Sequence, residues 1–182
     1  HTLGRHAWML GSLYNRAIGF GGMSVASYGS ESQREKLLPQ ITRGELLFAL
    51  ALTENGAGSD ASAISCKATR SDGGFVLNGS KAWVSDAKQA DYIIVAARTS
   101  GSPGSNVGIS LFLLPRGSED VQMTVLDKVG NHCLPTYDVH FDNAFVDESS
   151  MMGELDRGFS HLMSTLHFAR AGMAASVSGY AQ

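Results

Sequence analysis

The pattern of hydrophobic and polar positions changes twice along the chain. Between residues 6 and 28, apolar and small residues recur at helical spacing, and the same spacing returns from residue 156 to the end. From residue 46 to about residue 147, short apolar runs are separated by turn residues. Strands at this spacing with no helices between them favour an antiparallel β-barrel or sandwich. The pattern therefore predicts an α+β chain in which helices flank a β domain.

Polar residues mark the end of the first helical region. Ser30 followed by Gln33 predicts a capping box that opens a short helix. That helix is expected to run to about Leu38, because Pro39 disturbs the pattern and Gly44 ends the segment. The β domain is therefore expected to begin just after this segment.

Within the β region, strands are expected over residues 65–70, 91–98, 107–114, 121–126 and 137–141, and a β-hairpin over residues 74–84. Asn78-Gly79 lies between two apolar runs and predicts a type I′ hairpin turn, because both central residues of that turn need positive φ. The return strand would then carry Trp83, Val84 and Ser85.

The most distinctive stretch is L-A-L-T-E-N-G-A-G-S-D, at residues 50–60. Its first half is typical of a buried strand, and its second half contains glycines that let a backbone approach a ligand without an intervening Cβ. We interpret it as a binding loop. The flat indole of Trp83 beside the Ser85 hydroxyl suits a flat ligand with heteroatoms at its edge.

Two carboxylates, Glu54 and Asp60, lie in this loop and could be taken for an acid–base pair. Carboxylates in such positions more often cap turns or accept backbone N–H bonds. We therefore interpret both as structural.

Composition excludes several function classes. A net charge of -3 gives no basic surplus for nucleic acid, and no apolar run approaches the roughly 20 residues that span a bilayer. Cys66 and Cys133 match no metal or redox spacing, so we expect reduced thiols, and the six scattered histidines predict no metal site. The chain starts at His1 with no signal peptide, as expected of an excised fragment.

The two stretches together resemble a known family. T-E-x-G-A-G-S-D, followed roughly twenty residues later by N-G-x-K-x-W-V-S, is similar to the flavin-binding middle of the acyl-CoA dehydrogenases. The resemblance implies the end of an N-terminal helical domain at residues 1–46, a middle β domain at 47–155, and the first helix of a truncated C-terminal helical domain at 156–182.

The resemblance also implies a binding site for FAD. Leu50, Leu52 and Thr53 would lie along the isoalloxazine ring, with Thr53 hydrogen-bonding its pyrimidine side. Gly58 and Ser59 would meet the flavin pyrophosphate and the pantetheine arm of an acyl-CoA thioester, so that Ser59 also binds substrate.

The second motif would complete the flavin contacts. By resemblance, Trp83, Val84 and Ser85 run along the flavin ring, with Ser85 in place of the commoner threonine near N5. Asp86 follows where a small or amide residue is usual, and would add negative charge near the flavin edge.

The chemistry implied is α,β-dehydrogenation, in which a glutamate removes the α-proton of the thioester and the β-hydrogen leaves as hydride to the flavin. Ala169 occupies one family position for that base, so no catalytic base is expected in this chain. Arg170 matches an arginine near cofactor and substrate, and its small neighbours favour a sheltered position. Leu13, Ala17 and Phe20 are weaker candidates for lining the acyl pocket.

Other functions remain open at this point. A flavin monooxygenase or nitroalkane oxidase shares the fold, and a noncatalytic flavin- and CoA-binding module would keep the same platform. The resemblance further implies a homodimer or homotetramer, an electron-transfer flavoprotein as electron acceptor, and a bacterial cytoplasmic location, with the mitochondrial matrix as the alternative.

Overall fold

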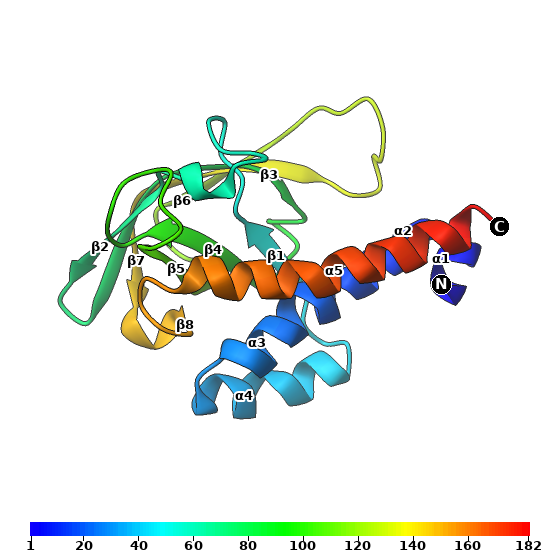
Figure 1. Cartoon of the computed structure of the whole chain (residues 1–182), viewed down its shortest axis with the longest axis horizontal. Coiled ribbons are helices and arrows are strands. Elements are labelled where there is room, and N and C mark those ends of the chain that lie inside the picture. The colour runs from blue at the N-terminus through cyan, green and yellow to red at the C-terminus, as the bar shows by residue number, and fades with distance from the viewer. The chain divides into compact units, whose positions relative to one another are not determined.

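The computed structural model describes the backbone of residues 1–182 and every side chain except that of Trp8. The chain forms two compact units (Figure 1). A helical unit contains His1–Leu47 and His161–Gln182, and a sheet unit contains Phe48–Ser160. The α+β prediction is confirmed in this coarse form.

The helical unit is built from five α-helices and a π-helical segment: α1 (Thr2–His6), α2 (Trp8–Tyr14), η1 (Asn15–Gly22, π), α3 (Met23–Tyr28), α4 (Glu31–Thr42) and α5 (Gly158–Tyr180). The helix expected over residues 6–28 is thus interrupted by η1, which contains the half-buried Ala17 and Phe20. Leu13, at the end of α2, is also half-buried.

The start of α4 is as predicted and its end is not. The Gln33 backbone N–H donates to Ser30 Oγ at 3.1 Å, and the Ser30 N–H donates to Gln33 Oε1 at 3.0 Å, which confirms the capping box. The helix then continues through Pro39 to Thr42.

Tertiary packing explains this extension. Leu37 and Ile41, on either side of Pro39, are only 2% and 3% exposed. Burial of two such side chains stabilises by roughly 3–6 kcal/mol in total, which is comparable to the cost of a proline inside a helix.

Small residues let α5 pack closely on the first helices. A Cβ on Gly11 would lie 2.2 Å from Ser176 Oγ, so only glycine fits there. Farther along, the Asn15 side-chain amide donates to the carbonyl of Ala169 at 2.9 Å. The glycines that weaken the helical pattern therefore serve helix packing.

The sheet unit contains eight strands: β1 (Phe48–Ala51), β2 (Lys67–Ser71), β3 (Gly74–Ser85), β4 (Tyr92–Arg98), β5 (Ile109–Pro115), β6 (Val121–Val125), β7 (Thr136–Asp147) and β8 (Met151–Met152). Short 3-10 turns, η2 (Ala61–Ala63) and η3 (Glu148–Ser150), lie between strands. The strand order is β6-β7-β3-β2-β4-β5-β8, with β1 paired to β4. The sheet is mixed and not purely antiparallel as expected, since β1 runs parallel to β4.

The sheet folds over its own core. The rings of Phe75 on β3 and Phe112 on β5 lie 5.0 Å apart, although β3 and β5 are not neighbours in the hydrogen-bonded order. Within the described residues the path of strands stays open, since β6 pairs only with β7 and β8 only with β5.

The prediction of a hairpin turn at Asn78-Gly79 is wrong. Strand β3 runs unbroken through both residues, and the β2–β3 turn is Asp72-Gly73, enclosed by the pair Ser71↔Gly74. Gly79 has a φ of 134°, and a Cβ there would lie 2.9 Å from the Cα of Cys66 on the approaching chain. The glycine is therefore needed for close approach within the sheet and not for a turn.

Candidate functional site

The two sequence stretches that were expected to bind a ligand meet in the sheet unit. The backbone N–H of Ala82 on β3 donates to the carbonyl of Thr53, just after β1, at 2.7 Å. The first motif therefore lies directly beside the second.

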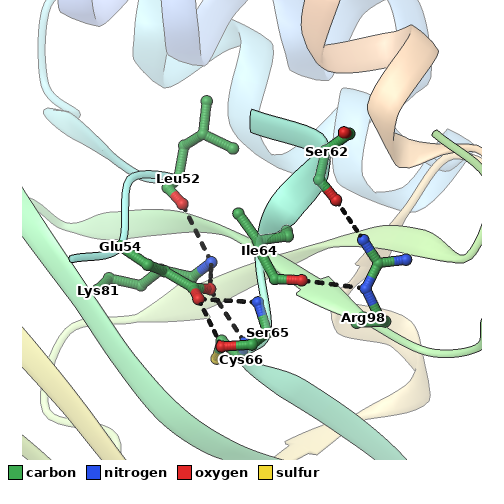
Figure 2. Close-up of polar contacts among 8 residues, drawn as sticks. All are labelled: Leu52, Glu54, Ser62, Ile64, Ser65, Cys66, Lys81 and Arg98. Atoms are coloured by element: carbon green, nitrogen blue, oxygen red, sulfur yellow. Dashed lines mark hydrogen bonds and ion pairs between the residues drawn. The ribbon is translucent and has the colours of Figure 1, made fainter. Parts of the chain in front are cut away.

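A buried ion pair reinforces this junction (Figure 2). Lys81 Nζ lies 2.7 Å from Glu54 Oε1 and donates to the carbonyl of Leu52 at 3.1 Å. The Lys81 side chain is fully buried and that of Glu54 is 9% exposed. Figure 2 shows the two side chains pointing toward each other from different segments.

Glu54 has further donors on the opposite side. The backbone N–H and the hydroxyl of Ser65 donate to Oε2 at 2.8 and 2.9 Å, and the Cys66 N–H donates to Oε1 at 3.0 Å. A carboxylate bound by four donors is held in place and poorly suited to proton transfer. The geometry supports the structural interpretation of Glu54.

The electrostatics agree with a charged pair. Burial acts to raise the pKa of Glu54, but the Lys81 ammonium and the Ser65 and Cys66 N–H groups outweigh it and hold that pKa below its usual value. Burial lowers the pKa of Lys81, which Glu54 opposes. Burial also raises the pKa of the Cys66 thiol to about 11.

The far side of the binding loop is also fixed. Asp60 accepts from the backbone N–H and hydroxyl of Ser62 at 3.0 and 2.5 Å and so caps the short turn η2. The Arg98 guanidinium then donates to the carbonyls of Ser62 and Ile64 at 2.6 and 3.0 Å. The chain that leaves the loop is therefore pinned to β4, as Figure 2 shows.

Trp83 lies at a β-bulge in β3. The pairing with β7 shifts between Lys81↔Val139 and Val84↔Tyr137, so one extra residue is inserted on β3. Trp83 has a φ of 60°, a left-handed conformation that costs a non-glycine residue about 1–3 kcal/mol. Its indole is 60% exposed. The bulge therefore turns a large aromatic side chain outward beside the binding loop.

The other residues predicted to lie at the ligand differ in solvent exposure. The side chain of Val84 is fully buried in the core, so the predicted contact of this residue with a flavin would be made by its backbone. Asp86, expected to add charge near a ligand edge, is 5% exposed. The remaining predicted positions are open: Leu50, Leu52, Thr53 and Ser85 are half-buried, and Gly58 and Ser59 are exposed.

Three hydroxyls at this site are available. Within the part of the chain that the structure describes, the side chains of Thr53, Ser59 and Ser85 have no hydrogen-bond partner. Gly58 has open space as well, since a Cβ there would meet nothing within 4 Å. The arrangement can offer hydroxyl and backbone groups to a flat, polar-edged molecule next to an exposed indole.

Two predicted residues belong to the helical unit. Ala169 is 4% exposed and its methyl group has no acid–base chemistry. Arg170 is exposed, so the sheltered position expected from its small neighbours is wrong. Leu162, Thr165 and Ala169 are buried on one face of α5, and the next residue projects away from that face.

The sequence analysis gave no role to Lys81 or Arg98. Arg98 ends an apolar run and Lys81 directly precedes a short one, and a charge that becomes buried needs a partner. That signal identifies Lys81 as a paired residue, although it does not identify Glu54 as the partner. Among the described residues, no group of three potential metal ligands is found. No described helix has both the length and the apolar character needed to cross a bilayer.

Comparison with known proteins identifies the family of this chain. Residues 49–144 match the family model for the acyl-CoA dehydrogenase middle domain. The chain is 38% identical over 180 residues to a 3-(aryl)acrylate reductase from Clostridium sporogenes and 35% identical to a mitochondrial isovaleryl-CoA dehydrogenase from Solanum tuberosum. These alignments each cover 92% of this chain, and 48% and 43% of the two relatives.

The solved structure of butyryl-CoA dehydrogenase from Megasphaera elsdenii is also similar. It superposes with a TM-score of 0.91 at 32% identity, covering 97% of this chain and 46% of that one. The chain thus spans less than half the length of the relatives it matches.

Proposed function

Since the chain belongs to the acyl-CoA dehydrogenase family, we propose that its sheet unit is the FAD and acyl-thioester platform of an enzyme that introduces an α,β double bond into an acyl-CoA. The observation that carries the proposal is the junction of the two motifs, where the Ala82 N–H donates to the Thr53 carbonyl at 2.7 Å.

The residues present are suited to a flavin. An isoalloxazine ring has a flat apolar face and a polar edge, and the exposed indole of Trp83 and the free hydroxyls of Thr53 and Ser85 match these two features. Half-buried Leu50 and Leu52 add apolar surface beside Thr53.

In this proposal each group of the chain has a separate task. The hydroxyls of Thr53 and Ser85 orient the ring by hydrogen bonds, and Trp83 covers it and excludes water. The open backbone at Gly58 and the Ser59 hydroxyl bind the pyrophosphate or the pantetheine arm. Bound FAD would supply the acceptor for the two electrons removed from the substrate.

Proton abstraction requires a base that Ala169 does not provide. We place this base outside residues 1–182, which is compatible with relatives about twice as long as this chain. Arg170, exposed on α5, is proposed to contact cofactor or substrate through its guanidinium.

The wider assignments are part of the same proposal. Residues 1–46 would end an N-terminal helical domain, residues 47–155 form the middle domain as a β-sandwich-like sheet, and residues 156–182 begin a C-terminal helical domain. The whole protein would be a homodimer or homotetramer that passes electrons to an electron-transfer flavoprotein, in a bacterial cytoplasm or a mitochondrial matrix.

A second candidate is the reverse chemistry. The relative from Clostridium sporogenes, 38% identical over 180 residues, is named a reductase of 3-(aryl)acrylates, which carry an α,β double bond. The same platform would then support reduction of an unsaturated acid or thioester.

Anaerobic mixing of the full-length, FAD-loaded protein with saturated acyl-CoA thioesters tests the proposal. Bleaching of the flavin absorbance with formation of the enoyl product supports dehydrogenation. If only the chemically reduced protein reacts, and does so with an unsaturated substrate, the reductase is favoured. Absence of both reactions across a panel of acyl groups would contradict the proposed function.

A further inference from the structure

Two consecutive carbonyls near the start of the first motif, those of Leu52 and Thr53, are bound by adjacent residues of β3. The Lys81 ammonium donates to the Leu52 carbonyl at 3.1 Å, and the Ala82 N–H donates to the Thr53 carbonyl at 2.7 Å. The next residue along β3 is Trp83 at the bulge. Residues 81–83 therefore both bind the first motif and carry the exposed indole of Trp83.

This segment needs external support. Trp83 keeps a left-handed φ of 60°, and such a conformation persists only where the surrounding contacts determine it. The register shift leaves no partner on β7 for Ala82 or Trp83. The bonds from Lys81 and Ala82 to Leu52, Thr53 and Glu54 therefore hold the bulge in place on the side of the first motif.

We infer that Lys81 is a positioning residue for the flavin site: its buried ammonium fixes the first half of the first motif against the bulge, so that Thr53 and Trp83 face the same ligand. The inference rests on the proposed function, because the ligand is taken to be FAD. Lys81 acts through Leu52 and Glu54 and needs no contact with the cofactor itself.

The alternative is that the ion pair only stabilises the fold. A buried ion pair is weak evidence for stability, because removing both charges together is often neutral or stabilising. Met has nearly the length of Lys without the ammonium, and Gln keeps the shape of Glu. With its amide oxygen toward Ser65, the glutamine of E54Q would keep both bonds from that residue and lose the one from the Cys66 N–H. The double variant E54Q/K81M therefore leaves no unpaired buried charge, but lacks the bonds from Lys81 to the Leu52 carbonyl and from Cys66 to residue 54.

The experiment compares wild type, K81M, E54Q/K81M and R70M by thermal unfolding and FAD titration. Arg70 forms an exposed ion pair with Glu148 at 2.9 Å, so R70M removes a cation from the same unit without touching the site. We expect the double variant to regain part of the stability that K81M loses, yet to bind FAD at least tenfold more weakly than wild type. Wild-type FAD affinity in the double variant would overturn the inference.

A second readout works without FAD. Amide hydrogen exchange at Ala82, and acrylamide quenching of Trp83 in a Trp8→Phe background, report the junction directly. Faster exchange and altered quenching in E54Q/K81M, with R70M unchanged, support positioning even if wild type binds no FAD and the proposed function fails. Unchanged values in the double variant contradict positioning whatever the FAD result.

Discussion

The backbone N–H of Ala82 lies 2.7 Å from the carbonyl oxygen of Thr53, and this bond joins two segments that are separate in the sequence. It brings the available hydroxyl of Thr53 near the outward-turned indole of Trp83. A binding site that uses both the Thr53 hydroxyl and the Trp83 indole is therefore assembled by the fold of the sheet unit, together with the buried ion pair of Glu54 and Lys81.

Replacement of Trp83 should weaken FAD binding without unfolding the protein. The indole is 60% exposed, so Trp83→Ala loses little buried area but removes the stacking surface. We expect a decrease in affinity of about twofold to tenfold, from roughly 0.5–1.5 kcal/mol of aromatic contact, measured by quenching of flavin fluorescence.

The matched control is Phe145→Ala, another exposed aromatic residue of the sheet unit, 51% exposed on β7. It should leave FAD affinity unchanged, and Trp83→Phe should retain most of it. Equal losses in Trp83→Ala and Phe145→Ala would show that the indole has no specific role.

Gly79→Ala should destabilise the sheet unit. Its φ of 134° is strained for alanine, and the new Cβ would lie 2.9 Å from the Cα of Cys66. We expect a loss of at least about 2 kcal/mol in the free energy of unfolding, measured by urea denaturation. Gly130→Ala, where a Cβ meets nothing within 4 Å, should change it by less than about 0.5 kcal/mol. Similar effects at both positions would refute the close-approach explanation.

Cys66 should make stability fall in alkaline solution. Burial raises the pKa of its thiol from 9.0 to about 11, so the folded state keeps a proton that the unfolded chain has lost. This contribution is fully present below pH 9 and is lost as the pH rises toward 11. Relative to wild type, Cys66→Ala should show a flatter decline in unfolding free energy over that interval. If the unfolding free energies of wild type and Cys66→Ala fall in parallel over this interval, the assignment of the decline to Cys66 is contradicted.

The two thiols should differ in reactivity. Cys133 is exposed, whereas Cys66 is 1% exposed and has a raised pKa. A thiol reagent should modify one cysteine rapidly in the native protein and the second only on unfolding. Peptide mapping that finds Cys66 modified first would show that the region around the ion pair opens readily.

Local chemistry in the sequence predicts local structure well. The capping box of Ser30 and Gln33 depends on residues three apart, and it forms as expected. The paired motifs likewise led to the correct family, and the fold joins their two segments through the bond from the Ala82 N–H to the Thr53 carbonyl.

Non-local contacts explain the errors. Asn78-Gly79 has turn chemistry, but the glycine is required by the approach of Cys66, which is distant in sequence. The exposure of Arg170 depends on which face of α5 packs against other helices, and the partner of Lys81 depends on how β1 and β3 meet. Composition and spacing along one chain contain none of this information.

The most direct test of the flavin platform is an NMR titration of the ¹⁵N-labelled chain with FAD. We expect saturable shifts of the amide signals of Thr53, Trp83 and Ser85, with little change at Asp72 in the β2–β3 turn. Saturable binding that leaves these three signals unmoved, or no binding at all, would contradict the assignment of this site to the flavin.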